Sequence, residues 1–163
     1  MWATPNVHGW NKKLGFMNTE IGPIEWQAIS YSRLNAKQKE IYNFQKAAAV
    51  LADYGFDCIK LADDWGGADF LAYNKDREKT YKVQLKTRAS VWKKYKNKDL
   101  WMLFQSPVSK GPWYMIHHDK LLELVRQNTT WLESEVWEDG ECLNRKPTKE
   151  LRKALAPYII PGT

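Results

Sequence analysis

The clearest alternation of hydrophobic and polar positions along the chain lies between residues 63 and 88. From Tyr81 to Thr87, apolar side chains at positions 81, 83 and 85 alternate with polar ones at 82, 84 and 86. A period of two is typical of a β-strand with one buried and one polar face. Asp69 follows a Gly-Gly-Ala run at the start of a second such stretch. If the two strands pair, Asp69 joins Gln84 and Lys86 on one polar patch.

A carboxylate, an amide and a lysine on adjacent strands fit two interpretations. They can hold a hard divalent cation and a water beside a phosphate, because such cations take oxygen ligands. They can equally form the solvated face of an edge hairpin, as alternating strands commonly do. The hairpin alone does not distinguish between these two interpretations. The sequence on either side of it is needed to choose between them.

Residues 35 to 54 have the pattern of an amphipathic helix. Asn35 is a good N-cap, Gln38 stands where a capping box places it, and Gly55 closes the C-terminus. Glu40 falls on the same face as the apolar side chains, one turn earlier. Such a carboxylate is paired with a cation, or lies close enough to the helix start to reach water and favour the dipole. Both alternatives stay open.

Shorter patterns predict the remaining elements. We expect a strand at 56–61, a loop ADDWGG in which Asp63 and Asp64 are solvated turn residues, and a second hairpin that extends the sheet. That hairpin comprises 100–105 and 113–117, and helices follow at 119–127 and 149–155. The acidic stretch 131–143 suits either a late strand or a loop.

The first part of the chain has no clear periodicity. Residues 1–33 contain Trp2, Trp10, Phe16, Trp26 and Tyr31 among Pro and Gly. We expect an aromatic-rich N-terminal extension that packs on the domain or on a second subunit, with residues 34–163 as a single domain.

Composition narrows the class of protein. The chain has 163 residues, and no stretch approaches 18 consecutive apolar positions. Its start lacks the apolar region of a signal peptide, so we expect a cytoplasmic protein. Cys58 and Cys142 stand in unrelated contexts and indicate neither a metal motif nor a disulfide framework.

The distribution of charge says more than the net charge of +6. Residues 75–98 hold ten Lys and Arg and two acids, whereas residues 119–142 hold seven acids and two bases. A molecule with one positive side is typical of proteins that bind a phosphate backbone, although lysine-rich loops can simply aid solubility. The basic cluster directly flanks the Gln84–Lys86 strand, which favours nucleic-acid binding.

After Lys86 comes a basic loop or short helix in which aromatic and basic residues interleave. We expect it to hold phosphates without reading sequence, with Trp92 or Tyr95 stacking on a base or covering the core. The candidate nucleic-acid-binding residues are Arg88, Trp92, Lys93, Lys94, Tyr95, Lys96 and Lys98.

A histidine pair, His117 and His118, precedes the predicted helix at 119–127. Paired histidines suit catalysis or metal binding, but no third ligand follows at a usable spacing. An unrelated α+β enzyme built on them is therefore a weak alternative.

The parts occur in a recognisable order: a helix with Glu40, an Ala/Leu-rich turn with Gly-Phe, then Gly-Ala-Asp-Phe at 67–70 and Val-Gln-Leu-Lys at 83–86. This order, over about residues 35–104, resembles the PD-(D/E)XK nuclease superfamily in its variant with Gln before the lysine. KYKNKDLWMLF, at 94–104, is also similar to the continuation in small bacterial relatives. The resemblance implies an α/β fold of restriction endonuclease type, with a mixed central sheet of four to five strands flanked by helices.

The resemblance also implies roles. Asp69, the Gln84 side-chain oxygen and the Leu85 backbone carbonyl would bind Mg²⁺ or Mn²⁺. Glu40 would hold metal-bound waters, and Lys86 would orient the attacking water and stabilise charge on the phosphorane.

The sequence departs from the family pattern at two positions, which differ in their importance for metal binding. Ala68 stands where the name motif has Pro, which the chemistry does not need. Gln84 in place of an acid removes one negative charge from the metal site, although Glu40 and Asp69 remain to hold a cation.

The resemblance thus implies a metal-dependent endonuclease that hydrolyses phosphodiester bonds in DNA and acts as a homodimer. RNA stays open as a substrate. The alternative keeps the fold and loses the chemistry, as a catalytically inactive nucleic-acid-binding module or partner subunit.

Overall fold

The computed structural model describes residues 23–163. Its elements are, in order, η1 (Tyr31–Arg33), α1 (Ala36–Ala52), β1 (Phe56–Trp65), β2 (Ala68–Asn74), β3 (Lys79–Lys86), β4 (Ser90–Val91), η2 (Lys93–Tyr95), β5 (Leu100–Gln105), β6 (Trp113–His117), α2 (His118–Asn128), η3 (Trp131–Glu133), α3 (Glu135–Glu138), β7 (Leu143–Asn144), α4 (Lys149–Leu155) and η4 (Ala156–Tyr158). In this described part, no helix combines the length and the apolar character needed to span a membrane.

Five strands form a mixed sheet in the order β1-β2-β3-β5-β6. β1, β2 and β3 pair antiparallel, β3 and β5 pair parallel, and β5 and β6 form the predicted antiparallel hairpin. The parallel step between β3 and β5 is made by a connection that contains β4 and η2. A mixed five-stranded sheet flanked by helices agrees with the α/β prediction.

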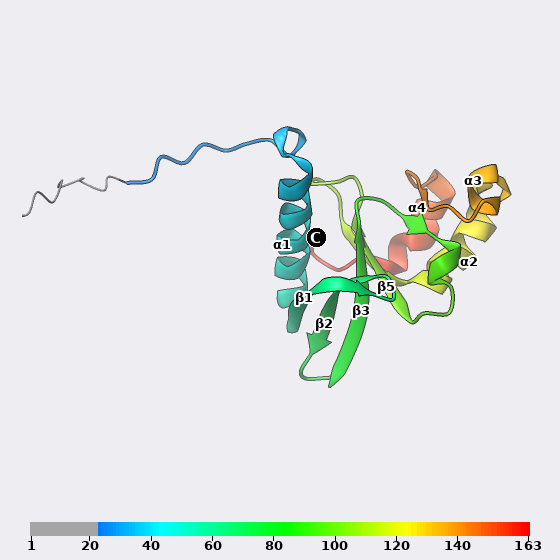
Figure 1. Cartoon of the computed structure of the whole chain (residues 1–163), viewed down its shortest axis with the longest axis horizontal. Coiled ribbons are helices and arrows are strands. Elements are labelled where there is room, and N and C mark those ends of the chain that lie inside the picture. The colour runs from blue at the N-terminus through cyan, green and yellow to red at the C-terminus, as the bar shows by residue number, and fades with distance from the viewer. Residues whose placement is uncertain (1–22) are drawn as a thin grey trace, which may run out of the picture.

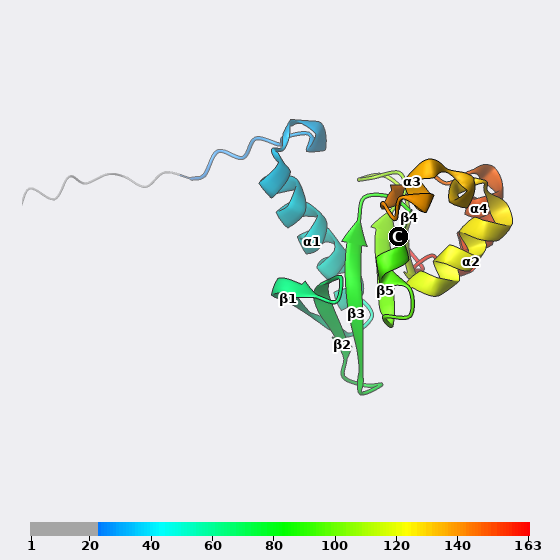
Figure 2. The ribbon, with the colours of Figure 1, turned by 45° about the vertical axis from the view of Figure 1, so that its right-hand side comes forward.

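Helices cover the two faces of this sheet (Figure 1). α1 packs its buried Ala47 and Leu51 with Phe70 and Val83 on one face. α2 and α4 pack with the strands on the other face, in a second core that includes Met102. Figure 2 shows α1 on one side of β3 and the α2–α4 group on the other.

Local sequence explains where α1 begins and ends. The Asn35 side chain accepts from the Gln38 N–H at 2.8 Å, and the Gln38 side chain accepts from the Asn35 N–H at 2.9 Å. This confirms the predicted capping box. Gly55, with φ of +73°, follows the last turn and directs the chain into β1.

Two predicted boundaries were wrong. β1 continues to Trp65, so Asp63 belongs to a strand rather than to a loop, because an edge strand accepts polar side chains on its solvated side. The acidic stretch 131–143 is mainly η3 and the short helix α3, and only its last residue enters β7.

The described part of the N-terminal extension packs on the domain at Tyr31 but not at Trp26. Tyr31 packs on α1, where its hydroxyl accepts from the Asn43 amide at 3.0 Å. Trp26 is 87% exposed and does not pack on the domain. Trp2, Trp10 and Phe16 lie outside the described residues.

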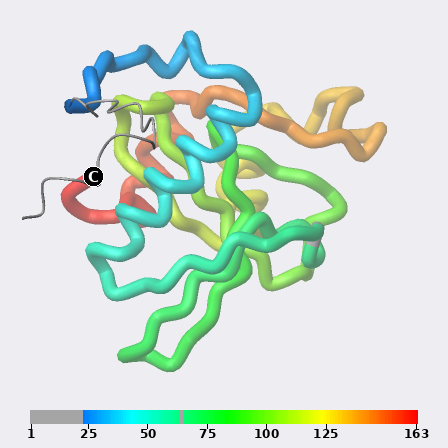
Figure 3. The backbone as a smooth tube through the Cα atoms, turned by 60° about the vertical axis from the view of Figure 1, so that its left-hand side comes forward, coloured from blue at the N-terminus to red at the C-terminus, as the bar shows by residue number. Residues whose placement is uncertain are grey.

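The C-terminal segment returns across the sheet to α1. Figure 3 shows it passing beside that helix. The Ile160 N–H donates to the Trp113 carbonyl at 2.8 Å, and the Tyr54 hydroxyl donates to the Pro161 carbonyl at 2.5 Å. These contacts tie the last residues to β6 and to the end of α1, away from the predicted site.

Candidate active site

A cavity of about 520 Å³ lies where α1 meets β1, the start of β2 and the end of β3. All four predicted catalytic residues line it: Glu40 from α1, Asp69 from β2, and Gln84 and Lys86 from β3. The sequence separates Glu40 from Lys86 by 46 positions, and the hairpin together with the overlying helix brings them to one place. Further lining comes from Asn43, Phe44, Lys60, Leu61, Ala62, Asp63, Gly67, Ala68, Leu85 and Thr87.

Asp69 connects the two central strands of the site. Backbone pairing between β2 and β3 ends at Phe70 and Val83. Beyond that pair, the Asp69 carboxylate accepts from the Leu85 N–H at 2.7 Å and from the Gln84 side-chain amide. The pairing thus brings Asp69 to Gln84, as the alternation predicted.

The Gln84 amide points its two ends in opposite directions. Its nitrogen donates to Asp69, and its oxygen accepts from the Tyr95 hydroxyl at 2.7 Å. Both Gln84 and Tyr95 are buried, at 5% and 3% exposure. The prediction that Gln84 offers its oxygen to a metal therefore needs the amide to rotate by a half-turn. Tyr95 permits this rotation, because a hydroxyl can donate to the oxygen or accept from the nitrogen.

Gly67 makes room for Tyr95 beside the cavity. It has φ of +99°, and a Cβ atom built there would overlap the Tyr95 ring and lie 3.2 Å from Leu100. Gly66, with φ of +66°, has open space at the same position. The two glycines therefore have different roles: Gly66 allows a tight turn, and Gly67 allows the Tyr95 ring to approach the backbone closely.

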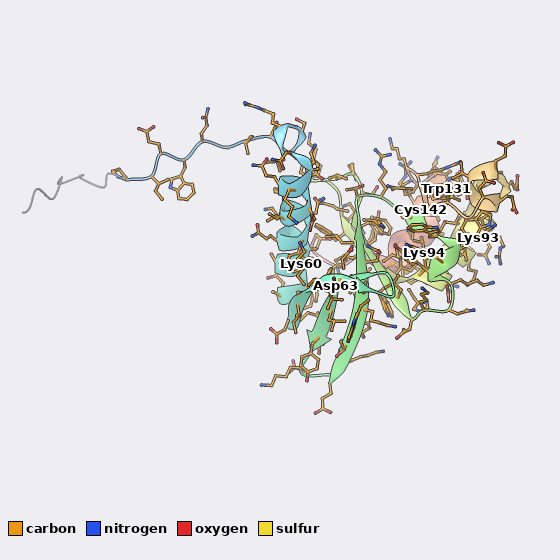
Figure 4. All side chains as sticks on the ribbon, viewed as in Figure 1. Lys60, Asp63, Lys93, Lys94, Trp131 and Cys142 are labelled. Carbon is orange, nitrogen blue, oxygen red and sulfur yellow. The ribbon has the colours of Figure 1, made fainter. Side chains whose placement is uncertain are left out.

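Glu40 is held by two lysines on the α1 side of the cavity. Its carboxylate binds the Lys60 ammonium at 2.6 Å and the Lys37 ammonium at 3.0 Å. These hydrogen bonds, with that from Lys60 first, lower the pKa of Glu40 below its ordinary value. Both alternatives left open for Glu40 are observed, since its carboxylate pairs with two ammonium groups and its side chain is also 50% exposed to water. Figure 4 shows Lys60 beside α1 and Asp63 close by.

Lys86 and Asp63 complete the charges of the cavity. Lys86 is half-buried, and within residues 23–163 its ammonium has neither an ion pair nor a hydrogen bond. Asp63 is exposed at the end of β1 and lines the same cavity. Sequence reasoning missed Lys60 and misplaced Asp63, although a period of two from Cys58 through Lys60 offered a signal for Lys60.

The donor set suits a hard divalent cation. Carboxylate oxygens of Asp69, Glu40 and Asp63 line the cavity, and the Gln84 oxygen joins them after rotation. In the described residues, no three acidic, histidine or cysteine groups converge closely enough to hold a metal ion together. The arrangement therefore fits an ion bound directly by Asp69 and Gln84, with water in other positions and Glu40 reached through water, as Mg²⁺ prefers.

The two aromatic residues of the basic segment after β3 cover the core. Tyr95 is buried against Gly67 and cannot stack on a base. The Trp92 ring is fixed by its indole N–H, which donates to the Gly140 carbonyl at 2.6 Å, and it carries the Lys94 ammonium at 3.6 Å. Lys93 turns to Glu138, 3.7 Å away. Both aromatics therefore serve the fold, the second of the two roles considered for them.

The histidines lie outside the cavity. His118 is fully buried, its Nε2 accepts from the Trp92 N–H at 3.2 Å, and its Nδ1 lies 3.0 Å from an Asp119 oxygen. Burial lowers the pKa of His118. His117 accepts from the Asp119 N–H at the start of α2. These contacts anchor η2 and α2 and do not support a catalytic histidine pair.

In comparisons with known proteins, no family model, no curated protein and no solved structure matches this chain. The nuclease resemblance therefore stays a prediction, and the function has to be argued from the geometry of the cavity.

Proposed function

We propose that this protein is a metal-dependent endonuclease of restriction endonuclease-like fold that hydrolyses phosphodiester bonds in DNA within this cavity. The observation that carries the proposal is the meeting of Glu40, Asp69, Gln84 and Lys86 in one cavity. Asp69 and Gln84 are in direct contact there. Action as a homodimer belongs to the same proposal, because nucleases that cut both strands of a duplex commonly pair two such sites. A cytoplasmic location is also part of the proposal.

Each side chain has a role that its chemistry suits. Asp69, the rotated Gln84 amide and the Leu85 backbone carbonyl would hold Mg²⁺ or Mn²⁺, with Glu40 binding through water. When bound, the ion supplies an acidified water and stabilises negative charge on the phosphate oxygens. Lys86 brings an ammonium that orients the water and neutralises charge as the phosphorus becomes pentacoordinate.

A second candidate function is a nucleic-acid-binding module without catalysis. Two contacts favour it: the Gln84 oxygen is bound by Tyr95, and the Glu40 carboxylate is bound by Lys60 and Lys37. Three oxygens that would serve a cation, that of Gln84 and both of the Glu40 carboxylate, thus already have partners within the protein. Asp69 and Lys86 in the same cavity favour the nuclease, because binding alone has no use for that pair.

Cleavage of supercoiled plasmid with Mg²⁺ or Mn²⁺ tests the proposal, with single-stranded DNA and RNA offered in parallel. Asp69→Asn keeps the size of the side chain and removes its charge. The matched control is Asp57→Asn, because Asp57 is an exposed strand aspartate that does not line the cavity.

We expect metal-dependent nicking or linearisation that is lost in Asp69→Asn and kept in Asp57→Asn. Failure to cleave any of the three substrates, with binding retained in chelator, would overturn the nuclease and support the binding module.

A further inference from the structure

A two-stranded sheet brings a distant basic segment to the edge of the cavity. β4 and β7 pair antiparallel through Ser90–Asn144 and Val91–Leu143, and the Ser90 hydroxyl reaches the Asn144 side chain at 3.1 Å across 54 positions of sequence. The Arg145 N–H continues this pairing to the Ala89 carbonyl at 3.3 Å. Thr87, which lines the cavity, precedes Ala89 by two positions, so the segment after β7 lies near the cavity.

The cations at this edge are available to a ligand. Arg88, Arg145 and Lys146 are exposed, and within the described range of the chain none has an ion pair or a side-chain hydrogen bond. Arg88 precedes β4, and Arg145 and Lys146 follow its partner strand β7. Figure 2 shows β4 beside the end of β3. Exposed guanidinium groups without carboxylate partners are well suited to phosphate, which they can bind with two hydrogen bonds.

Positive charge continues from this edge toward Lys86 and Lys94. Cys142, which precedes β7, lies close enough to both ammonium groups for their charges to act on it: burial raises the pKa of its thiol, and Lys86 and Lys94 oppose that rise. Figure 4 shows Cys142 and Lys94 close together, with Lys93 farther out. Lys94 therefore extends the positive surface toward the cavity, while Lys93 is neutralised by Glu138.

We propose that Arg88, Arg145 and Lys146, the β4–β7 basic surface, bind the phosphate backbone of a nucleic acid and direct one strand into the cavity. Only the destination of the strand rests on the proposed function, since backbone binding needs no catalysis. Such contacts position a nucleic acid without reading its sequence.

The turn between β2 and β3 provides a natural comparison. Lys75, Arg77 and Lys79 are also exposed, but they alternate along the chain with Asp76 and Glu78, which offset their charge. The turn lies at the opposite end of β3 from β4 (Figure 2). Removing three charges there changes the net charge of the protein by the same amount as removing them at the β4–β7 basic surface.

The test is fluorescence anisotropy in EDTA between 50 and 200 mM salt, with labelled duplex DNA, single-stranded DNA and duplex RNA as separate probes. The full chain is compared with Arg88→Gln/Arg145→Gln/Lys146→Gln and with the control Lys75→Gln/Arg77→Gln/Lys79→Gln. We expect the first triple variant to bind roughly 10- to 100-fold more weakly at 100 mM salt. Its log–log salt slope should be shallower by about 2.7, because each lost phosphate contact contributes about 0.9. The probe with the largest loss identifies the class of nucleic acid.

Three outcomes would overturn this surface: no binding of any probe by the unmodified protein, an unchanged slope in the first triple variant, or an equal loss in the control. Arg145→Lys is the control for misfolding. It changes the same side chain but keeps the positive charge, so it should retain most of the affinity. Cleavage is silent in EDTA, so a failed surface and a failed nuclease give different results.

Discussion

The two walls of the cavity are held in different ways. The β2–β3 wall is held by a chain of hydrogen bonds that runs from Asp69 through Gln84 to Tyr95. Gln84 and Tyr95 are buried. On the α1–β1 wall, Glu40 is held by Lys60 and Lys37 through ion pairs whose side chains are 39–70% exposed. A buried polar group is costly to leave without a partner, whereas exposed ion pairs contribute little. The β2–β3 wall should therefore fix the positions of Asp69 and Gln84, and the α1–β1 wall should set the charge state of Glu40.

This difference has a consequence for a bound cation. The β2–β3 wall can change only by discrete steps, such as the half-turn of the Gln84 amide against Tyr95. The α1–β1 wall can change continuously, since Glu40 can exchange an ammonium for a metal-bound water at the surface of the protein. Three substitutions test this contrast, and the largest effect should come from the buried wall.

Gly67→Ala should be the most damaging. The new Cβ would overlap the Tyr95 ring, and φ of +99° strains any residue with a side chain. We expect a loss of unfolding free energy on the order of 3 kcal/mol, since backbone strain of this kind costs about 1–3 kcal/mol and the overlap adds to it. Gly66→Ala has open space and should cost about 1 kcal/mol. Urea unfolding measures both, and equal losses would show that Tyr95 is not fixed by this contact.

Tyr95→Phe should have the next largest effect. It keeps the ring and deprives the buried Gln84 oxygen of the hydroxyl that donates to it. We expect a loss of about 1–3 kcal/mol in unfolding free energy, the usual cost of leaving a buried acceptor unsatisfied. The matched control is Tyr73→Phe, because Tyr73 is half-buried on β2 and should change stability by less than about 0.5 kcal/mol. If the two variants unfold alike, the Gln84 amide is not held by Tyr95.

Sequence reasoning succeeded where the signal was local. The alternation from Tyr81 to Thr87 specified which side chains of β3 share a face, and the Asn35–Gln38 pair specified the start of α1. The joining of Asp69 to Gln84 followed from hairpin pairing, which is also local. These features depend on residues close together in the chain, so periodicity and capping rules are enough to find them.

It failed where a residue's environment is set by distant parts of the chain. Tyr95 stands among lysines, and its local sequence left open whether it stacks on a base or covers the core, whereas contacts with Gly67 and Gln84 bury it. The pairing of β4 with β7 joins segments 54 positions apart, and two-residue strands have no periodicity to detect. The partner of Glu40 lies 20 positions away, in a strand whose alternation indicates the face on which Lys60 lies but not the side chain that it meets. Each of these contacts depends on the folded arrangement rather than on the local sequence.

Lys60→Gln should have the smallest effect on stability and a clear effect on the pKa of Glu40. The hydrogen bond from Lys60 is the largest single cause that lowers the pKa of Glu40, so the removal of Lys60 should raise that pKa toward the ordinary value. A carboxyl with a lowered pKa stabilises the fold above its unfolded pKa and loses that contribution as pH falls below it. The loss of stability in Lys60→Gln should thus be present at pH 7 and vanish in acid, below the pKa of Glu40 in the folded protein, and it should be small because the ion pair is exposed.

Carbon-13 NMR titration of the Glu40 carboxyl measures this shift directly. Lys37→Gln is the matched control, since it removes the other ammonium from the same carboxylate and should move the pKa by less. A larger shift in the control would reverse the order of the two lysines. A substantial loss of stability at pH 7 in Lys60→Gln would mean that the α1–β1 wall holds the cavity as firmly as the buried wall, and the contrast between them would fail.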